Sequence, residues 1–372
     1  MRFSIDLSAV PARPAGAGRY AIALASGICE SMSESDSALL ISSSHTAAFW
    51  QGLAPCAEVA AKVPGNRVLR LIYEQTLFER LLNKNLIDVH HGIHYTMPEG
   101  FKGATVVTVH DLTLLEHPEW HQRSKAILFK RALLVAAKSA DFLICPSNFT
   151  ADKLRNLLSP KGSVVVIHHG VDQKGIGGES GDPARLPEGL SRSPYILFVG
   201  TIEPRKDLAT LLSAFERIGE KNGDIALVIA GQVGWKATEV IARIDGSPLK
   251  ERIFRLDYVD EATLGALYAK ASAFVYPSFE EGFGLPVLEA MRSGVPVITT
   301  RGTSMAEVAR GSALLFSPGN YEELSAAIES VIDQTVASEK LVAKGLAVSS
   351  EYTWEASIKA HLAVYRLAAE RN

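Results

Sequence analysis

The sequence predicts an α/β protein in which two doubly wound, Rossmann-like domains face each other across a cleft. Three observations favour this fold. The 372 residues exceed one compact core, short apolar runs alternate with helix-like segments throughout, and a single Gly/Pro/Ser-rich stretch divides the chain. The composition, 47% hydrophobic and 21% charged, is typical of a globular protein.

The first half, residues 1–172, contains six short apolar runs that predict buried strands. Several are apolar throughout, as strands covered on both faces must be. The predicted strands are residues 3–7, 38–42, 88–93, 105–109, 142–145 and 164–167. Residues 173–193 then have ten Gly, Pro or Ser among 21 residues and no apolar periodicity, which predicts an interdomain linker.

The same alternation restarts in the second half, residues 194–352. The predicted strands are residues 195–199, 225–230, 253–256, 273–276, 295–299 and 313–316, and the predicted helices are 208–218, 262–270, a helix from 286, and 321–333. A last helix, within residues 353–372, follows the completed sheet, and we expect it to pack on the first domain. Parallel sheets of this kind bind nucleotides at their carboxyl edges.

Charge and cysteine content narrow the class of protein. A net charge of -3 and a pI near 6.4 give no indication of a nucleic-acid partner. Cys29, Cys56 and Cys145 lack metal-ligand spacing, so we expect core thiols in a reducing compartment. No run is long enough to span a bilayer and no signal sequence is evident, which favours a cytoplasmic location. Ser147 predicts a helix start, so the sequon at Asn148 is expected to be accidental.

The most informative stretch is residues 277–291, where a strand ends in a Gly-rich turn and a helix opens near Pro286. Its unpaired backbone N–H groups predict an anion site, formed by Gly282, Phe283, Gly284 and Leu285. Glu281 and Glu289 are separated by seven residues and can bind different hydroxyl groups of one ligand. The alternative is an ordinary helix N-terminus with favourable acidic residues.

This stretch resembles the E-x7-E signature of retaining glycosyltransferase family 4, whose fold is called GT-B. The resemblance extends to residues 198–208, 108–112 and 16–20. It implies that a sugar moves from a nucleotide diphosphate to an acceptor with retained anomeric configuration. The donor is a substrate, so no cofactor is implied.

The resemblance also assigns roles to cations and to a histidine. Arg205 and Lys206 would neutralise the diphosphate leaving group, which makes a metal ion unnecessary, and no Asp-x-Asp motif is present. His110 would contact the transferred sugar together with Glu281, while Glu289 would hold the ribose. By themselves an Arg–Lys pair is usually solvated and a lone histidine is usually structural. We expect His90, His91, His168 and His169 to be core or cleft-wall residues.

Further family positions complete the predicted site. Gly16, Ala17 and Gly18 would form a loop over the diphosphate, Arg19, Tyr20 and Asp111 would lie on the acceptor side, and Gly200, Thr201, Tyr258 and Val259 would line the donor site. Asp257 departs from the glycine common in relatives, which leaves the nucleobase open. His110 is followed by Asp111, a pairing able to orient the imidazole.

The segment from Gly200 to Lys206 favours mannosyltransferases, and therefore GDP-mannose as donor. Transferases using UDP-glucose, UDP-N-acetylglucosamine or dTDP-rhamnose share much of it, and a nucleotide-sugar epimerase or a non-catalytic binding subunit is a weaker alternative. The implied acceptor is a glycan or lipid-linked hydroxyl. Two basic-apolar segments, residues 67–84 and 121–138, either pack on their own core or lie on an anionic membrane. The sequence leaves the acceptor, the linkage and the oligomeric state open.

Overall fold

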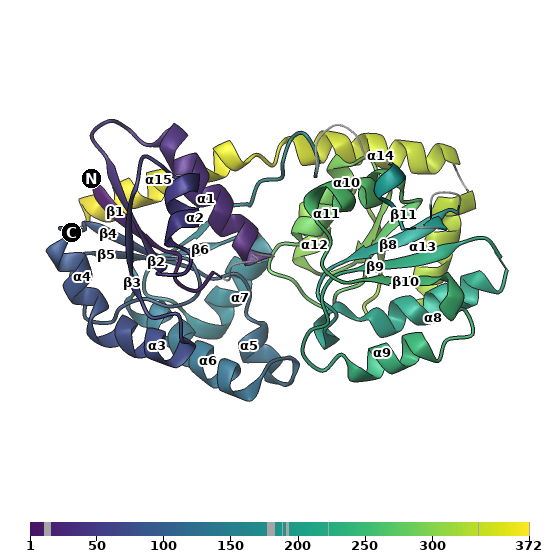
Figure 1. Ribbon diagram of the computed structural model, residues 1–372, viewed down its shortest axis with the longest axis horizontal. Helices are drawn as coiled ribbons and strands as arrows, with labels where there is room; N and C mark the ends of the chain where they lie inside the picture. Colours follow the sequence, from purple (N-terminus) through teal and green to yellow (C-terminus); the bar gives the residue numbers. More distant parts are fainter. Residues whose placement is uncertain are drawn as a thin grey trace. The chain divides into compact units, whose positions relative to one another are not determined.

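The computed structural model describes residues 1–10, 16–176, 183–187, 189–190, 193–221, 223–333 and 335–371. The chain forms two compact units, coloured mainly purple to teal and teal to green in Figure 1. Unit 1 comprises Met1–Pro118, Arg123–Gly170 and Trp354–Asn372, and unit 2 comprises Glu119–Gln122 and Val171–Thr353.

Unit 1 is built on a seven-stranded parallel sheet with the order β3-β2-β1-β4-β5-β6-β7. The strands are β1 (Arg2–Asp6), β2 (Ser37–Ser43), β3 (Glu58–Val63), β4 (Val89–Gly92), β5 (Ala104–Thr108), β6 (Phe142–Cys145) and β7 (Ser163–Val166). The order reverses between β1 and β4, so the loops after these two strands leave the sheet in opposite directions. Such a switch point is where open α/β sheets bind ligands.

Alternate residues of these strands are buried in hydrophobic cores on opposite faces of the sheet. This explains why the strands are apolar throughout. Phe142 and Ile144 of β6 face one core, while Leu143 and Cys145 face the other. Helices α1 (Ala17–Ser31), α2 (Ala47–Leu53) and α15 (Trp354–Glu370) lie on the first face, and α3 (Arg67–Thr76), α4 (Phe78–Lys84), α6 (Arg123–Ser139) and α7 (Asn148–Leu158) lie on the other (Figure 1).

The C-terminal helix α15 is fixed in unit 1 by both apolar and polar contacts. Its Ile358 and Leu362 are buried beside α1 and the sheet. Its His361 Nε2 lies 2.8 Å from the Tyr20 hydroxyl, and its Tyr365 hydroxyl lies 2.6 Å from His91 Nδ1. The helix therefore supplies part of the core of unit 1.

Unit 2 contains a six-stranded parallel sheet with the order β10-β9-β8-β11-β12-β13. Its strands are β8 (Tyr195–Val199), β9 (Ala226–Ala230), β10 (Ile253–Leu256), β11 (Ala273–Tyr276), β12 (Val297–Thr300) and β13 (Leu314–Phe316). Its helices are α8 (Leu208–Gly219), α9 (Thr238–Asp245), α10 (Glu261–Lys270), α11 (Leu285–Arg292), α12 (Ser304–Ala309), α13 (Tyr321–Asp333) and α14 (Thr335–Ser350). The switch point of this sheet lies between β8 and β11.

These elements confirm the predicted doubly wound class and every predicted strand to within two residues. Strand β3 was not predicted, because its Glu, Ala and Lys residues lie at an exposed sheet edge and carry no apolar run. Helix α14 was also not predicted, because its apolar residues do not follow a clear helical stripe and Gly345 interrupts them. The helix start at Ser147 is confirmed, since its hydroxyl accepts a hydrogen bond from Thr150 N at 3.1 Å.

The two basic-apolar segments place part of their apolar residues inside the protein. Residues 67–84 form two helices, α3 and α4, and Phe78, Leu81 and Leu82 of α4 are buried in the core. In α3, Leu69 is exposed, and in α6, Ile127 is exposed. Within the described part of the chain, no helix has the length and hydrophobicity to cross a membrane.

The cysteine prediction is wrong for two of the three residues. Cys29 of α1 and Cys56, after α2, form a disulfide with Cα atoms 5.6 Å apart, whereas Cys145 is the buried thiol that we expected. The disulfide was not predicted, because 26 residues separate the two cysteines in the sequence. The cysteines come together only when α1 and α2 pack beside each other in the tertiary structure. Disulfides are rare in reducing compartments, so the cysteine content no longer argues for one.

We expect Leu362→Ala in α15 to lower the free energy of unfolding by about 2–5 kcal/mol, because it leaves a cavity in a closed core. Leu367→Ala, on the same helix but 51% exposed, is the control and should change stability by less than about 0.5 kcal/mol. Urea unfolding followed by circular dichroism measures both. Equal effects of the two changes would show that α15 is not part of the unit 1 core.

Candidate active site

The candidate site of unit 2 lies at the switch point of its sheet. Strands β8 and β11 are paired neighbours, and their following loops carry Arg205–Lys206 and Glu281 respectively. Residues far apart in sequence thereby meet at one sheet edge. This is the position at which doubly wound sheets hold phosphate-bearing ligands.

A short 3-10 helix, Pro204–Lys206, sets the two cations beside each other. It ends at Asp207, whose φ of 46° turns the chain into α8 and whose carboxylate caps that helix at Thr210 N. The Arg205 carbonyl accepts a hydrogen bond from Phe279 N at 2.9 Å, which ties this turn to the loop after β11. The backbone around the cations is therefore held on both sides.

Glu281 forms ion pairs with both cations. Its Oε2 lies 2.5 Å from Arg205 Nη1, and its Oε1 accepts from Lys206 Nζ. Lys206 also donates to the Tyr276 hydroxyl, and Glu203 binds the other side of Arg205 at 2.9 Å. Lys206 and Glu281 are 6% and 9% exposed, so these charges interact with little screening by water.

The two carboxylate–cation contacts decide the charge state of the cluster. Burial alone would raise the pKa of Glu281, but Arg205 and Lys206 outweigh it and lower that pKa to about 2. Burial lowers the pKa of Lys206, and Glu281 opposes this. Burial and the neighbouring Glu281 raise the pKa of Tyr276, so its hydroxyl stays protonated. Glu281 is therefore an ionised carboxylate at neutral pH.

The turn before α11 is fixed by packing and by its own backbone. Gly284 has a φ of 93°, and a Cβ there would lie 2.6 Å from Met305 Cγ, so glycine is required on both counts. The Ser304 hydroxyl donates to the Glu281 carbonyl at 2.6 Å. Within α11, Glu289 is buried, and its Oε2 accepts from the Tyr268 hydroxyl at 3.1 Å. The two signature glutamates thus have separate partners.

The remaining predicted donor residues lie at the same carboxyl edge. Gly200 follows β8 with a φ of 153°, and its carbonyl lies so close to Gly231 that a Cβ on Gly231 would be 2.1 Å away. Thr201 is packed closely against a second glycine, since a Cβ on Gly234 would lie 2.5 Å from the Thr201 methyl group. Tyr258 follows β10 and is 54% exposed, and Val259 is half-buried beside it.

In unit 1, His110 follows β5 beside the loop after β4. Its Nε2–H donates to the Ile93 carbonyl at 2.8 Å, which leaves Nδ1 as the acceptor in the neutral ring. Burial lowers the pKa of His110, against the opposing effects of Ile93 and Asp111, so the neutral ring is favoured. A neutral ring with Nδ1 as acceptor can receive a hydrogen bond from a sugar hydroxyl.

One expectation about the neighbours of His110 needs correction, and the other stays a prediction. The Asp111 carboxylate accepts from Thr113 N and Thr113 Oγ1, at 3.1 and 2.7 Å, which holds it beside the start of the helix Thr113–Glu116, and its effect on the orientation of the imidazole stays a prediction. Tyr20 was expected on the acceptor side, but it is 1% exposed, and its hydroxyl contacts Thr108 and His361. Its ring lies against that of His110, at 5.4 Å between centroids, and thereby supports the histidine.

Gly16 and Ala17 are exposed at the start of α1, and Gly18 is buried in its first turn. Gly16 has a φ of 53°, a conformation that favours glycine. Arg19 is half-buried in the same turn. His90, His91 and His169 are buried as expected, and His168 is half-buried.

The structure thus brings Arg205, Lys206 and Glu281 into direct contact within unit 2, and places His110 on Tyr20 within unit 1. Tyr276 and Tyr268, which bind Lys206 and Glu289, were missed by the sequence analysis. Tyr276 directly precedes the stretch 277–291, and this position was the signal in the sequence that could have identified it. No group of three or more His, Cys, Asp or Glu side chains suited to a metal ion occurs among the described residues.

Comparisons with known proteins decide the family. The Glycosyltransferase Family 4 model matches residues 15–174, and the model for Glycosyl transferases group 1 matches residues 186–346. The O-antigen chain mannosyltransferase B of Escherichia coli is 30% identical over 75% of this chain and 74% of its own length. This chain belongs to glycosyltransferase family 4. The serotype-specific mannosyltransferase WbdA of Escherichia coli is 31% identical, and the match spans only 29% of that longer protein.

Solved structures agree on the fold of this family 4 glycosyltransferase. Sucrose-phosphate synthase from Thermosynechococcus elongatus superimposes with a TM-score of 0.80 over all of both chains, at 18% identity. WaaG, a glycosyltransferase of lipopolysaccharide biosynthesis, gives a TM-score of 0.74 over 98% of this chain and 99% of its own, at 14% identity. The chain therefore has the GT-B fold.

The low pKa of Glu281 in this glycosyltransferase makes its contribution to stability depend on pH. The pKa falls from an ordinary 4.5 to about 2, so the contribution is complete above about pH 5 and is lost as the pH falls through 2. We expect the difference in unfolding free energy between the wild type and Glu281→Gln to shrink by on the order of 3 kcal/mol across that range.

Urea unfolding at a series of pH values measures this difference. Glu220→Gln, which removes an exposed carboxylate of the same unit, is the control and should show a small difference at every pH. A wild-type advantage over Glu281→Gln that stays constant from pH 6 to pH 2.5 would contradict the ion-pair assignment.

Proposed function

We propose that this glycosyltransferase moves mannose from GDP-mannose to a hydroxyl of a glycan or lipid-linked acceptor, with retention of configuration and without a metal ion. The observation that carries the choice of sugar is the similarity to the O-antigen mannosyltransferase, at 30% identity over three quarters of each chain. A second O-antigen mannosyltransferase, RfbU of Salmonella typhimurium, is 26% identical over 70% of this chain.

The site of unit 2 supports a donor with a charged leaving group. Arg205 and Lys206 are fixed cations at the switch point, and the N-terminus of α11 adds the positive end of its helix dipole. Charge on the diphosphate grows as the glycosidic bond breaks, so preorganised cations stabilise the transition state more than the bound donor. This chemistry needs no additional cation.

The uncharged acceptor atom of His110 supports a contact with the transferred sugar. Nε2 is committed to the Ile93 carbonyl, so Nδ1 is the atom available for a sugar hydroxyl. In this role His110 binds and orients, and it forms no covalent bond. Glu281, as an ionised carboxylate, can accept hydrogen bonds from sugar hydroxyl groups.

Other donors are distinguished by experiment. A relative named glycogen synthase, from Mycobacterium tuberculosis, is 27% identical over 72% of this chain, so a glucosyl donor is the first competitor. Thermal shift with GDP, UDP and dTDP ranks the nucleotides, because a tightly bound ligand raises the unfolding temperature. A shift with UDP that exceeds the shift with GDP would reject GDP-mannose. NMR of the product tests whether the configuration is retained.

Because fixed cations supply the positive charge, we expect EDTA to leave the initial rate within about twofold. Turnover of GDP-mannose with and without excess chelator measures this. If the rate disappeared with EDTA and returned with magnesium or manganese, Arg205 and Lys206 would not suffice for the leaving group.

Substitutions in the two units should affect nucleotide binding and reaction rate differently. We expect Lys206→Ala to weaken GDP binding and also to lower turnover, because it removes charge from both the bound and the transition state. His110→Ala should keep GDP affinity within about twofold and lose about tenfold to a thousandfold in rate, since a single transition-state contact has this effect.

Calorimetry with GDP and initial rates with GDP-mannose test these variants together. Lys250→Ala, which removes a lysine that is 60% exposed in unit 2, is the control and should alter neither quantity. A loss of GDP affinity in His110→Ala as large as that in Lys206→Ala would contradict this division between nucleotide and sugar contacts.

A further inference from the structure

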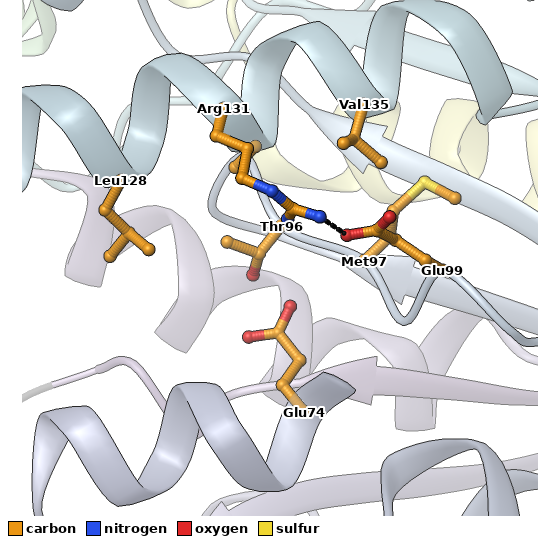
Figure 2. A pocket seen from close by; sticks show the side chains of 8 residues that line it. Glu74, Thr96, Met97, Glu99, Leu128, Arg131 and Val135 are labelled. Atoms are coloured by element: carbon orange, nitrogen blue, oxygen red, sulfur yellow. Dashed lines mark ion pairs between the residues drawn. The ribbon is translucent and has the colours of Figure 1, made fainter. Parts of the chain in front are cut away.

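A small cavity lies within unit 1, between α3 and α6, and the segment that follows β4 closes one side of it (Figure 2). Glu74 enters from α3, Thr96 from the segment after β4, and Leu128 and Arg131 from α6. The cavity has a volume of about 50 Å³ for water-sized groups. One water needs about 10–15 Å³ on this measure, so several oxygen-sized groups fit.

Glu74 is the residue that calls for an explanation. Its side chain points into the cavity, is only 4% exposed, and has an Oε1 atom with no hydrogen-bond partner. Burial, followed by the nearby Asp6 carboxylate, raises the pKa of Glu74 to about 8, against the opposing effects of Thr96 and Arg70. A buried carboxyl oxygen without a partner destabilises the fold, so a role in binding would account for it.

The other walls of the cavity indicate the chemistry of its ligand. Arg131 and Glu99 form an ion pair at 2.6 Å across from Glu74, and Leu128 and Val135 add apolar surface. A phosphate group is disfavoured, because the lining has two carboxyl groups, Glu74 and Glu99, and one cation, Arg131. No suitable metal-ligand cluster occurs in the described part of the chain. A carboxyl that is mostly protonated at neutral pH both donates and accepts hydrogen bonds, so these walls match hydroxyl groups next to a C–H surface, as in an uncharged sugar.

The cavity is structurally connected to His110. The segment after β4 gives the Ile93 carbonyl to His110 Nε2 and, three residues later, gives Thr96 to the cavity. The ring of His94 lies against both His110 and Phe129 of α6, at 5.7 and 5.1 Å between centroids. A sugar held in the cavity would therefore lie close to the residue assigned to the transferred sugar.

We propose that this cavity binds hydroxyl groups of the acceptor sugar, with Glu74 as the principal hydrogen-bonding residue and the Arg131–Glu99 pair as its opposite wall. The assignment to the acceptor rests on the proposed function. The volume admits the hydroxyl-bearing edge of one pyranose ring, and the rest of the acceptor lies outside.

The test uses Glu74→Leu in the full chain, because leucine keeps much of the volume and removes both carboxyl oxygens. Glu34→Leu, at an exposed position of the same unit, is the matched control. The probe is methyl α-mannopyranoside, observed by saturation-transfer NMR and also used as acceptor with GDP-mannose. Urea unfolding of each variant is measured alongside.

We expect the wild type and Glu34→Leu to give a saturation-transfer signal that GDP-mannose does not displace. In Glu74→Leu the saturation-transfer signal should be at least about tenfold weaker. The acceptor KM should rise, while the donor KM stays unchanged. Its urea midpoint should equal or exceed that of the wild type, because an unsatisfied buried carboxyl has been removed. A purely structural Glu74 would instead give a lower midpoint.

The proposal is overturned if the wild type gives no signal, if Glu74→Leu keeps it, if GDP-mannose displaces the probe, or if the signal is lost together with stability. If the wild type binds the probe but transfers nothing from GDP-mannose, the proposed donor is wrong and the sugar-binding cavity stands. If transfer occurs with an unchanged acceptor KM in Glu74→Leu, the cavity assignment fails and the proposed function stands.

Discussion

The contact of Glu281 with Arg205 and Lys206 is the interaction on which the candidate site in unit 2 of this glycosyltransferase depends. A buried lysine next to an arginine is unfavourable, because burial and like charge both oppose its protonation. One carboxylate between the two cations opposes both effects. It also joins the loop after β8 to the loop after β11, so the two halves of the switch point are fixed relative to each other.

The surrounding residues can be understood as supports for this contact. Gly284 is needed because the chain must turn against Met305 to bring Glu281 back toward β8. Tyr276 fills the space under Lys206 and offers it an oxygen. The candidate residue of unit 1 is held by different contacts. His110 is neutral, donates a hydrogen bond to a backbone carbonyl and packs against an aromatic ring. The candidate site of unit 2 is thus held by ion pairs, whereas His110 of unit 1 is held by an uncharged hydrogen bond.

The sequence predicted the fold well because apolar strand runs and glycine turns are local signals. Phe142–Cys145 and Tyr195–Val199 begin and end as predicted, since both are apolar runs bounded by polar or breaking residues. The motif residues around Glu281 were also predicted. Tyr20 was misjudged, because its hydrogen-bond partner His361 follows from the tertiary packing of α15, and the local hydrogen bonds of Asp111 to Thr113 were not predicted. Glu74 carries no sequence signal, since an acid in a helix normally faces water.

If the donor binds as proposed, the ion cluster also limits the strength of that binding. Arg205 already has Glu203 and Glu281 as partners, and Lys206 has Glu281, so the carboxylates balance the two cations. An entering diphosphate must therefore compete with carboxylates for the same cations, and its net affinity is the difference between the two sets of contacts. Such an exchange keeps the ground-state complex from becoming too stable. In the proposed reaction, contacts of the leaving diphosphate with the cations would strengthen as charge builds on it, while those of the carboxylates would not, so the cluster would favour the transition state over the bound donor.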